Sequence, residues 1–192
     1  MVNIVLFGPP GAGKGTQSEG IIKKYQLSHI STGDLFRKHL KEGSALGKLA
    51  QKYMDEGNLV PDTVVIDMVD DKIKTDEKVN GYIFDGFPRT VAQAEALDKL
   101  MNGKGNPISC MIALEVEKDE LLKRLLNRGK TSGRSDDQDE AKIQNRINVY
   151  ESETIPVANY YKKQGKFNSI HGIGTVDEIF IKISAVIDRF KV

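Results

Sequence analysis

Hydrophobic residues along the chain gather in short runs that are separated by longer amphipathic segments. The clearest runs cover residues 2–7, 81–84 and 108–114, and two weaker ones lie near 28–30 and 167–170. Each run has the length of a buried strand, and each intervening segment is long enough for a helix. Because strands that alternate with helices pair in parallel, the pattern predicts a five-stranded parallel sheet covered on both faces, a three-layer α/β/α fold.

Local signals mark where several helices begin. A helix over 14–25 should follow the first apolar run, and the Pro-Asp pair at the start of 61–74 should open another. Residues 90–93 and 175–178 both fit the capping-box pattern, in which a Thr is followed three residues later by Gln or Glu. The last helix is expected to bury one apolar face made of Ile179, Ile183, Val186, Ile187 and Phe190.

Two segments are predicted to be insertions rather than helices that cover the sheet. The first, about 32–60, has possible hinges at four glycines, Gly33, Gly43, Gly47 and Gly57. The second, 129–139, is polar and contains glycine, which is typical of a mobile loop. We therefore expect a single domain with a flap at about 32–60, a short lid at about 128–139, and a core made of 1–31, 61–127 and 140–192.

Composition and charge exclude several classes of protein. The 192 residues carry 28 basic and 27 acidic side chains, so bulk charge does not favour binding to nucleic acid or to an anionic membrane. Cys110 is the only cysteine, and no Cys/His cluster has zinc-site spacing, so neither a disulfide nor a structural zinc is expected. The chain has no signal-peptide pattern and no run of roughly 20 apolar residues, so we expect a cytoplasmic protein.

The strongest chemical signal is the segment 8–16, Gly-Pro-Pro-Gly-Ala-Gly-Lys-Gly-Thr, between the first strand and the first helix. Its glycines let backbone N–H groups converge on a phosphate, and Lys14 adds a positive charge. A glycine-rich turn without function is the weaker alternative. In the usual phosphate loop a Ser or Thr directly follows the Lys, but here Gly15 precedes Thr16, which disfavours GTPases and motor ATPases. The segment predicts a fold of the P-loop NTPase type.

Two further motifs and an arginine pattern extend this signal over nearly the whole chain. Residues 8–16, 31–37 and 84–90, with the arginines between 124 and 146, resemble the nucleoside monophosphate kinases, and among them the adenylate kinases that have a short lid. The resemblance implies reversible, Mg²⁺-dependent transfer of a phosphoryl group from ATP to AMP, which gives two ADP. The chain itself adds that no heptad or exposed apolar stripe suggests a dimer, so we expect a monomer, and that the lid is short and has no Cys or His, so we expect no structural zinc.

The resemblance assigns roles to individual residues. The ATP-binding set is Gly11, Ala12, Gly13, Lys14, Gly15, Thr16, Arg128 and Gly174. The AMP-binding set is Thr32, Arg37, Asn58, Leu59, Val60, Gly86, Phe87, Pro88, Arg89, Gln93, Arg134 and Arg146. The catalytic set is Lys14, Arg89, Arg124, Arg128, Arg134 and Arg146. Asp85 is implied to organise Mg²⁺ through water, and Gln93 to hydrogen-bond the adenine.

Local chemistry leaves alternatives for several of these residues. Gln93 fits equally well as the capping partner of Thr90, and Thr32 as a helix cap. Arg37 fits as a solvated surface charge, and Asp85 as a turn residue after a strand.

The distribution of arginine is a test that does not depend on the family. Seven of the 28 basic residues are Arg, and all except Arg189 fall at positions that the resemblance assigns to phosphate binding. Arg124 and Arg128 are four residues apart on one helix face, where like charges repel, so a shared anion would explain them. Asp136 and Asp137 could pair with lid arginines on closure or be solvated loop charges.

Two other functions compete with this interpretation. A uridylate/cytidylate kinase shares the phosphate loop and the short lid, but that branch tends to have Ala in place of Thr32 and Asn in place of Thr90. Both residues, together with Gln93, favour AMP. A nucleotide-binding regulatory switch is a rival of another class, and it would have no need of a second arginine set for an acceptor.

Overall fold

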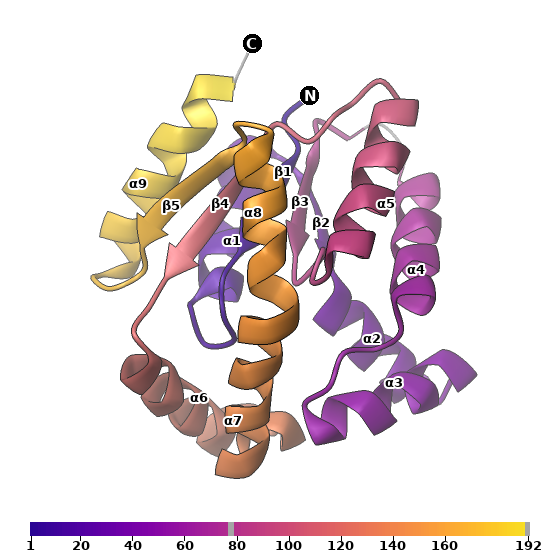
Figure 1. The fold of residues 1–192 in the computed structure, drawn as a ribbon, viewed down its shortest axis with the longest axis vertical. Helices are drawn as coiled ribbons and strands as arrows, with labels where there is room; N and C mark the ends of the chain where they lie inside the picture. The colour runs from indigo at the N-terminus through magenta and orange to yellow at the C-terminus, as the bar shows by residue number, and fades with distance from the viewer. Residues whose placement is uncertain (77–78, 191–192) are drawn as a thin grey trace.

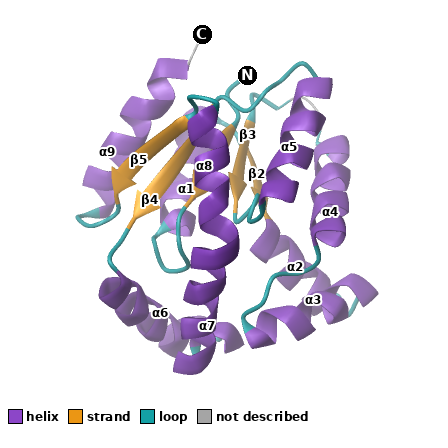
Figure 2. Cartoon of the chain, viewed as in Figure 1, coloured by secondary structure: helices purple, strands orange, loops and turns teal. Residues whose placement is uncertain are grey.

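The computed structural model describes residues 1–76 and 79–190 and contains a parallel sheet between two layers of helices (Figures 1 and 2). Its strands are β1 (Ile4–Phe7), β2 (Ser28–Ser31), β3 (Tyr82–Asp85), β4 (Cys110–Glu115) and β5 (Phe167–His171). Their order in space is β2-β3-β1-β4-β5, with every neighbouring pair parallel. The predicted five-stranded fold is confirmed, including both weak strand predictions.

Alternating side chains on the strands divide the core into two apolar layers. The helices of the described residues are α1 (Lys14–Tyr25), α2 (Thr32–Lys41), α3 (Ala45–Glu56), α4 (Asp62–Thr75), α5 (Val91–Gly103), α6 (Lys118–Ser132), α7 (Glu140–Val149), α8 (Ile155–Lys163) and α9 (Val176–Ile187). On β1, Val5 and Phe7 pack with residues of α4, α5 and α8, whereas Ile4 and Leu6 pack with residues of α1 and α9. This alternation follows from the two-residue period of a strand.

Helix α9 closes one side of the sheet as its pattern predicts. Ile179, Ile183 and Ile187 are buried, and Val186 and Phe190 pack partly buried against the same layer. Phe190 belongs to a short 3-10 turn, η3 (Asp188–Phe190), that extends the helix. The core predicted from the sequence includes residues 77–78, in the segment 61–127, and residues 191–192, in the segment 140–192. These four positions lie outside the described residues.

The flap segment folds as two helices, α2 and α3, that pack on each other beside the carboxyl end of the sheet (Figure 1). Two of its four candidate hinges lie inside these helices, Gly33 in α2 and Gly47 in α3. A Cβ on Gly47 would collide with the backbone of His39 and Leu40, so this glycine allows α2 and α3 to pack closely, and its role as a hinge stays a prediction. Gly43 and Gly57 have positive φ angles of 69° and 76° at helix ends, where glycine is favoured.

The loop predicted for 129–139 is shorter than the sequence suggested. Helix α6 continues through Ser132 and ends at Gly133, which has a φ of 64°. A 3-10 turn, η1 (Ser135–Asp137), then leads to α7, so only short connections are irregular. Gly129 lies inside α6, and the chain of Asp137 passes so close to it that a Cβ there would collide with the carbonyl oxygen of Asp137, which explains a glycine at this position.

Helices α7 and α8 form one long column that carries a π-helical turn, η2 (Tyr150–Thr154), at their junction (Figure 1). Pro156 stands in the first turn of α8, where a missing N–H leaves no hydrogen bond unmade. The wider turn before it accommodates the proline ring without breaking the column. Among the helices of residues 1–76 and 79–190, none is both long and apolar enough to cross a membrane.

Candidate active site

A cleft of about 920 Å³ opens at the carboxyl ends of the strands, between the α2–α3 pair and the α6–α7 pair. This is where ligands bind in open parallel sheets. Every residue that the sequence assigned to a site lines it, although these residues come from opposite ends of the chain. They are Gly11, Ala12, Gly13, Lys14, Gly15, Thr16, Thr32, Arg37, Asn58, Leu59, Val60, Asp85, Gly86, Phe87, Pro88, Arg89, Gln93, Arg124, Arg128, Arg134, Arg146 and Gly174.

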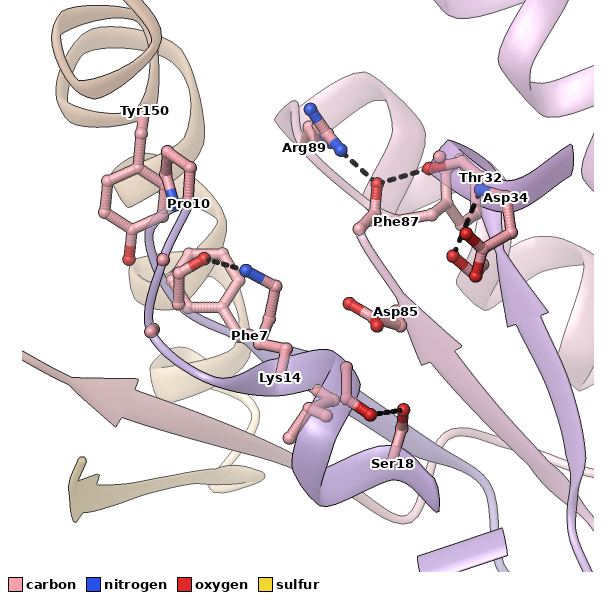
Figure 3. Close-up of a pocket in the computed structure, with 18 of the residues that line it drawn as sticks. Phe7, Pro10, Lys14, Ser18, Thr32, Asp34, Asp85, Phe87, Arg89 and Tyr150 are labelled. Atoms are coloured by element: carbon pink, nitrogen blue, oxygen red, sulfur yellow. Dashed lines mark hydrogen bonds between the residues drawn. The ribbon is translucent and has the colours of Figure 1, made fainter. Parts of the chain in front are cut away.

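The phosphate loop between β1 and α1 has a curved backbone, which two left-handed glycines and an internal hydrogen bond shape. Gly11 and Gly13 have φ angles of 85° and 92°, and the N–H of Ala12 donates to the carbonyl of Pro9 at 3.2 Å. Lys14 turns back over the loop, and its Nζ donates to the carbonyls of Gly8 at 2.7 Å and Pro9 at 3.0 Å (Figure 3). These contacts hold the ammonium group over the concave face of the loop.

Burial lowers the pKa of Lys14 to about 8, because the ammonium group loses its hydration. The carboxylate of Asp85 opposes this change, whereas the cations of Arg89, Arg146 and Arg128 add to it. Lys14 is therefore a cation that its surroundings destabilise. A bound anion would stabilise it.

Just after the end of β3, two side chains from different segments hydrogen-bond to the same backbone carbonyl, that of Gly86. Thr32 Oγ1 and Arg89 Nε each donate to the carbonyl oxygen of Gly86 at 2.8 Å. Gly86 has a φ of 73°, and a Cβ there would lie 3.0 Å from Arg89 Nη2. Asp85 points from the end of β3 into the space between Lys14 and Arg89 (Figure 3). The Phe87–Pro88 peptide bond that follows is cis.

The guanidinium group of Arg89 is accessible from the cleft, yet protein atoms and other cations surround it. This desolvation, with the charge of Arg146 next in size, lowers its pKa to about 10. Arg89 is still a cation at neutral pH, and the four N–H groups on its two Nη atoms are left for a ligand once Nε has bonded Gly86. Arg37, in α2, pairs with Asp34 at 2.5 Å, three residues before it on the same helix.

Gln93 lies in the first turn of α5 and is 1% exposed. Its backbone N–H donates to Thr90 Oγ1 at 3.2 Å, which is half of a capping box. Its side chain does not complete the box, because Oε1 accepts from the N–H of Arg89 at 2.8 Å and Nε2 donates to Asp62 Oδ1 at 2.7 Å. Thr175 and Glu178 at the start of α9 form both bonds of the box.

The lid side of the cleft is organised around one buried carboxylate. Asp137 has no exposed side-chain surface, and it accepts two hydrogen bonds from Arg128, at 2.6 and 2.9 Å, and one from Arg146 at 2.6 Å. Arg146 also pairs with Asp136 at 3.0 Å. Burial alone would raise the pKa of Asp137, but the hydrogen bonds and charges of Arg128 and Arg146 outweigh it and lower the pKa. Both carboxylates pair with arginines, so the solvated-loop alternative does not describe them.

The other two cleft arginines differ in their surroundings. Arg124 donates to Glu120 at 2.7 Å and to the carbonyl of Gly172 at 3.2 Å, so it and Arg128 bind different carboxylates here. Arg134 is half-buried, and desolvation together with the nearby charges of Arg37 and Arg128 lowers its pKa. Six arginines that sequence analysis singled out therefore meet at one cleft, and Arg189 lies outside it.

Two residues in the site escaped the sequence analysis. His29, in β2, lines the cleft with its Nε2 3.8 Å from Asp85 Oδ2, and that nitrogen has no hydrogen-bond partner among the described residues. His29 is the second residue of β2, so its place inside the predicted strand gave no signal for a site role. Asp62 was noted only as a helix start, and its contact with Gln93 joins residues 31 positions apart. Among the described residues, no group of three His, Cys, Asp or Glu side chains could hold a metal ion.

Comparison with known proteins gives a consistent family. A family model described as "Adenylate kinase" matches residues 6–166. An adenylate kinase of Flavobacterium psychrophilum is 52% identical over 189 residues, which is 98% of this chain and 100% of that protein. Adenylate kinases of Parabacteroides distasonis and Porphyromonas gingivalis are 50% and 44% identical, each over 191 residues and 100% of this chain, covering 100% and 98% of their own lengths.

Proposed function

The chain belongs to the adenylate kinase family and catalyses phosphoryl transfer from ATP to AMP, and from this premise we propose how its residues divide the work. The phosphate loop and Lys14 bind the donor phosphates. Thr32, Arg37 and Arg89 hold the acceptor phosphate, and the lid arginines surround the group in transit. The observation that carries this division is the meeting of all six arginines at one cleft, opposite a phosphate loop.

On the donor side, the backbone N–H groups at the start of α1 and the Lys14 ammonium bind phosphate oxygens. The N-terminus of α1 also directs the positive end of its dipole toward bound phosphates. When an anion arrives, Lys14 exchanges its two carbonyl partners for phosphate oxygens and gains charge-assisted hydrogen bonds. Gly174, before α9, contributes a backbone contact to the donor base.

On the acceptor side, Arg89 is aimed by its bond to Gly86, and Thr32 is fixed by the same carbonyl. The planar guanidinium fork matches two oxygens of a monophosphate. Asn58, Leu59 and Val60 line the acceptor base, and Gln93 hydrogen-bonds its edge. The attacking oxygen belongs to an anionic phosphate, so no general base is assigned.

During transfer, negative charge spreads over the oxygens of the moving phosphoryl group. Arg128 holds Asp137 with the two-bond fork geometry that suits a phosphate, and Arg146 adds a third bond through Nη1, so that carboxylate stands in for phosphate oxygens. Arg124 and Arg134 complete the cationic wall. Fixed cations in a cleft that closes to water can lower the barrier by several kcal/mol.

The cleft also suits the Mg²⁺ that accompanies ATP. Mg²⁺ keeps most of its water ligands and takes one or two protein carboxylates in addition to phosphate oxygens. Asp85 is a single carboxylate that faces Lys14 across the cleft, as such a site requires (Figure 3). Bound there, the ion would neutralise phosphate charge. We propose that residues 32–60 form the AMP-binding flap, that about 128–139 form a short lid, and that the enzyme acts as a monomer.

The substitution Arg89→Lys tests the acceptor assignment, because it keeps the charge and removes the fork. We expect kcat/KM for AMP to fall by about 100-fold, which is the loss of one bidentate, charge-assisted contact, while ATP affinity changes less than about twofold. Arg189→Lys is the matched control, since it makes the same change outside the cleft. An unchanged kcat/KM in Arg89→Lys would remove this residue from the acceptor site.

A coupled assay with AMP, UMP, CMP and GMP separates the rival functions in the wild-type protein. Fast ADP formation with AMP alone agrees with the assignment. UMP or CMP turnover at a similar rate would favour the uridylate/cytidylate branch, and ATP hydrolysis without an acceptor would favour a switch.

A further inference from the structure

An amide side chain reads a base edge reliably only when it cannot turn over. The Gln amide has an acceptor, Oε1, and a donor, Nε2, at the two corners of the same planar group. A rotation of 180° exchanges them with almost no change of shape. A free Gln could therefore pair with adenine, which offers an N6 donor and an N1 acceptor, or with hypoxanthine and guanine, which offer an O6 acceptor and an N1 donor.

The amide of Gln93 is held at both corners by partners that cannot change roles. The N–H of Arg89 can only donate, and it bonds Oε1 at 2.8 Å. An ionised Asp62 can only accept, and its Oδ1 bonds Nε2 at 2.7 Å. Rotation of the amide would place N–H against N–H and a carbonyl against a carboxylate. The surroundings thus fix which corner is oxygen and which is nitrogen.

Asp62 is itself held in place. It is the first residue of α4, and its second oxygen, Oδ2, accepts from Thr90 Oγ1 at 3.0 Å. The same Thr90 oxygen accepts from the backbone N–H of Gln93. Asp62, Thr90 and Gln93 therefore form a closed network that joins the start of α4 to the start of α5. Helices α4 and α5 pack against each other, which keeps their two starts close together.

The network still leaves one hydrogen-bonding position free at each corner of the amide. Oε1 has two lone pairs and has used one, and Nε2 has two hydrogens and has used one. Gln93 is 1% exposed but lines the cleft, so what it can offer a ligand is one acceptor and one donor in a fixed order. Among these purines, adenine has the complementary order and the 6-oxopurines hypoxanthine and guanine do not.

The geometry points to Asp62 as a specificity-determining residue that locks the Gln93 amide in the orientation that accepts adenine and rejects 6-oxopurines. This inference rests on the proposed role of Gln93 in binding the acceptor base. Asp62 acts through Gln93 and makes no contact with the base in this scheme, so it is a positioning residue. Turning the amide over would forfeit one charge-assisted and one neutral hydrogen bond, equivalent to a selectivity of about 10- to 1,000-fold.

The test compares AMP with IMP, which differs from it only at positions 1 and 6 of the purine. In Asp62→Asn the new amide can accept from Gln93 in one orientation and donate to it in the other, at the same volume. We expect the ratio of kcat/KM for AMP to that for IMP to fall by about 10-fold or more, mainly because IMP improves. Asp67→Asn is the matched control, because it removes the same charge from an exposed position of α4.

Gln93→Ala separates this inference from the proposed function on which it rests. If Gln93→Ala leaves the AMP/IMP ratio unchanged, Gln93 does not read the base and both proposals fail. If Gln93→Ala lowers the ratio and Asp62→Asn does not, base reading stands and the lock is overturned. A parallel loss of AMP and IMP turnover in Asp62→Asn, with a lowered Tm, would show a structural role and also overturn the lock.

Discussion

The phosphate loop and the Asp137 cluster, which is Asp137 with its partners Arg128 and Arg146, both place charge in desolvated surroundings, and they stabilise it in different ways. Lys14 has two backbone carbonyls as partners, which are dipoles, and its pKa falls to about 8. Asp137 has two guanidinium partners, and its pKa falls because they favour its charged form. The pKa of both groups is lowered, but with opposite meanings: a lower pKa disfavours the charged form of a lysine and favours the charged form of a carboxyl group.

The difference lies in how far each charge is compensated. The loop holds a cation whose charge is incompletely compensated, so it gains when an anion binds. The Asp137 cluster contains its own anion, so the charges of Arg128 and Arg146 are compensated within the protein. We therefore expect substitutions in the loop to affect catalysis more than stability, and substitutions at Asp137 to affect stability directly.

The largest expected effect is that of Lys14→Met on catalysis. The variant keeps an apolar stem of similar length but removes the charge that binds the transferring phosphates, so kcat/KM should fall by about 100- to 1,000-fold. The free energy of unfolding should change by less than about 1 kcal/mol, because the variant no longer buries a desolvated ammonium group. Steady-state kinetics and urea unfolding measure the two quantities. A large loss of stability would contradict the comparison.

Asp137→Asn is the converse experiment. It leaves two guanidinium groups beside a neutral amide, and we expect a loss of about 1–3 kcal/mol of stability at pH 7. The pKa of Asp137 is lowered in the folded state, so its stabilisation is present above the unfolded-state value of 3.8 and is lost as pH falls through the lower folded-state value.

Urea unfolding of both proteins from pH 7 to pH 3 measures this effect. The gap between wild type and Asp137→Asn should narrow below about pH 4. Lys163→Gln offers an exposed single-charge control. A gap of constant size would show that the carboxylate charge is not what Arg128 and Arg146 stabilise.

The smallest expected effect is the uptake of a fraction of a proton by Lys14 when a nucleotide binds the phosphate loop. Near pH 8 about half of Lys14 is unprotonated in the free protein, and bound phosphates should raise its pKa, so binding should take up roughly half a proton. Calorimetry with a non-hydrolysable ATP analogue, in two buffers that differ in ionisation enthalpy, measures this uptake. Lys14→Met should abolish it. Equal uptake by the variant would assign the proton to another group.

The sequence was enough to predict features that depend on neighbouring residues. The phosphate loop, the helix that starts at Lys14 and the box of Thr175 and Glu178 are local, since their hydrogen bonds join residues only a few positions apart. The sheet was predictable as well, although its strands lie far apart in the sequence, because the alternation of short apolar runs and helices leaves few possible topologies. Clustering of arginine at motif positions also pointed to the right cleft.

Only the tertiary structure decided features in which one short pattern had two possible partners. Thr90 with Gln93 has the same pattern as Thr175 with Glu178, yet the buried amide turns to Asp62 and Arg89, because desolvated polar groups must find partners wherever the packing places them. Likewise, whether Asp137 would be solvated or paired depended on Arg146 arriving from the next helix. Local chemistry determined which bonds were available to these residues, and the packing of distant segments selected among them.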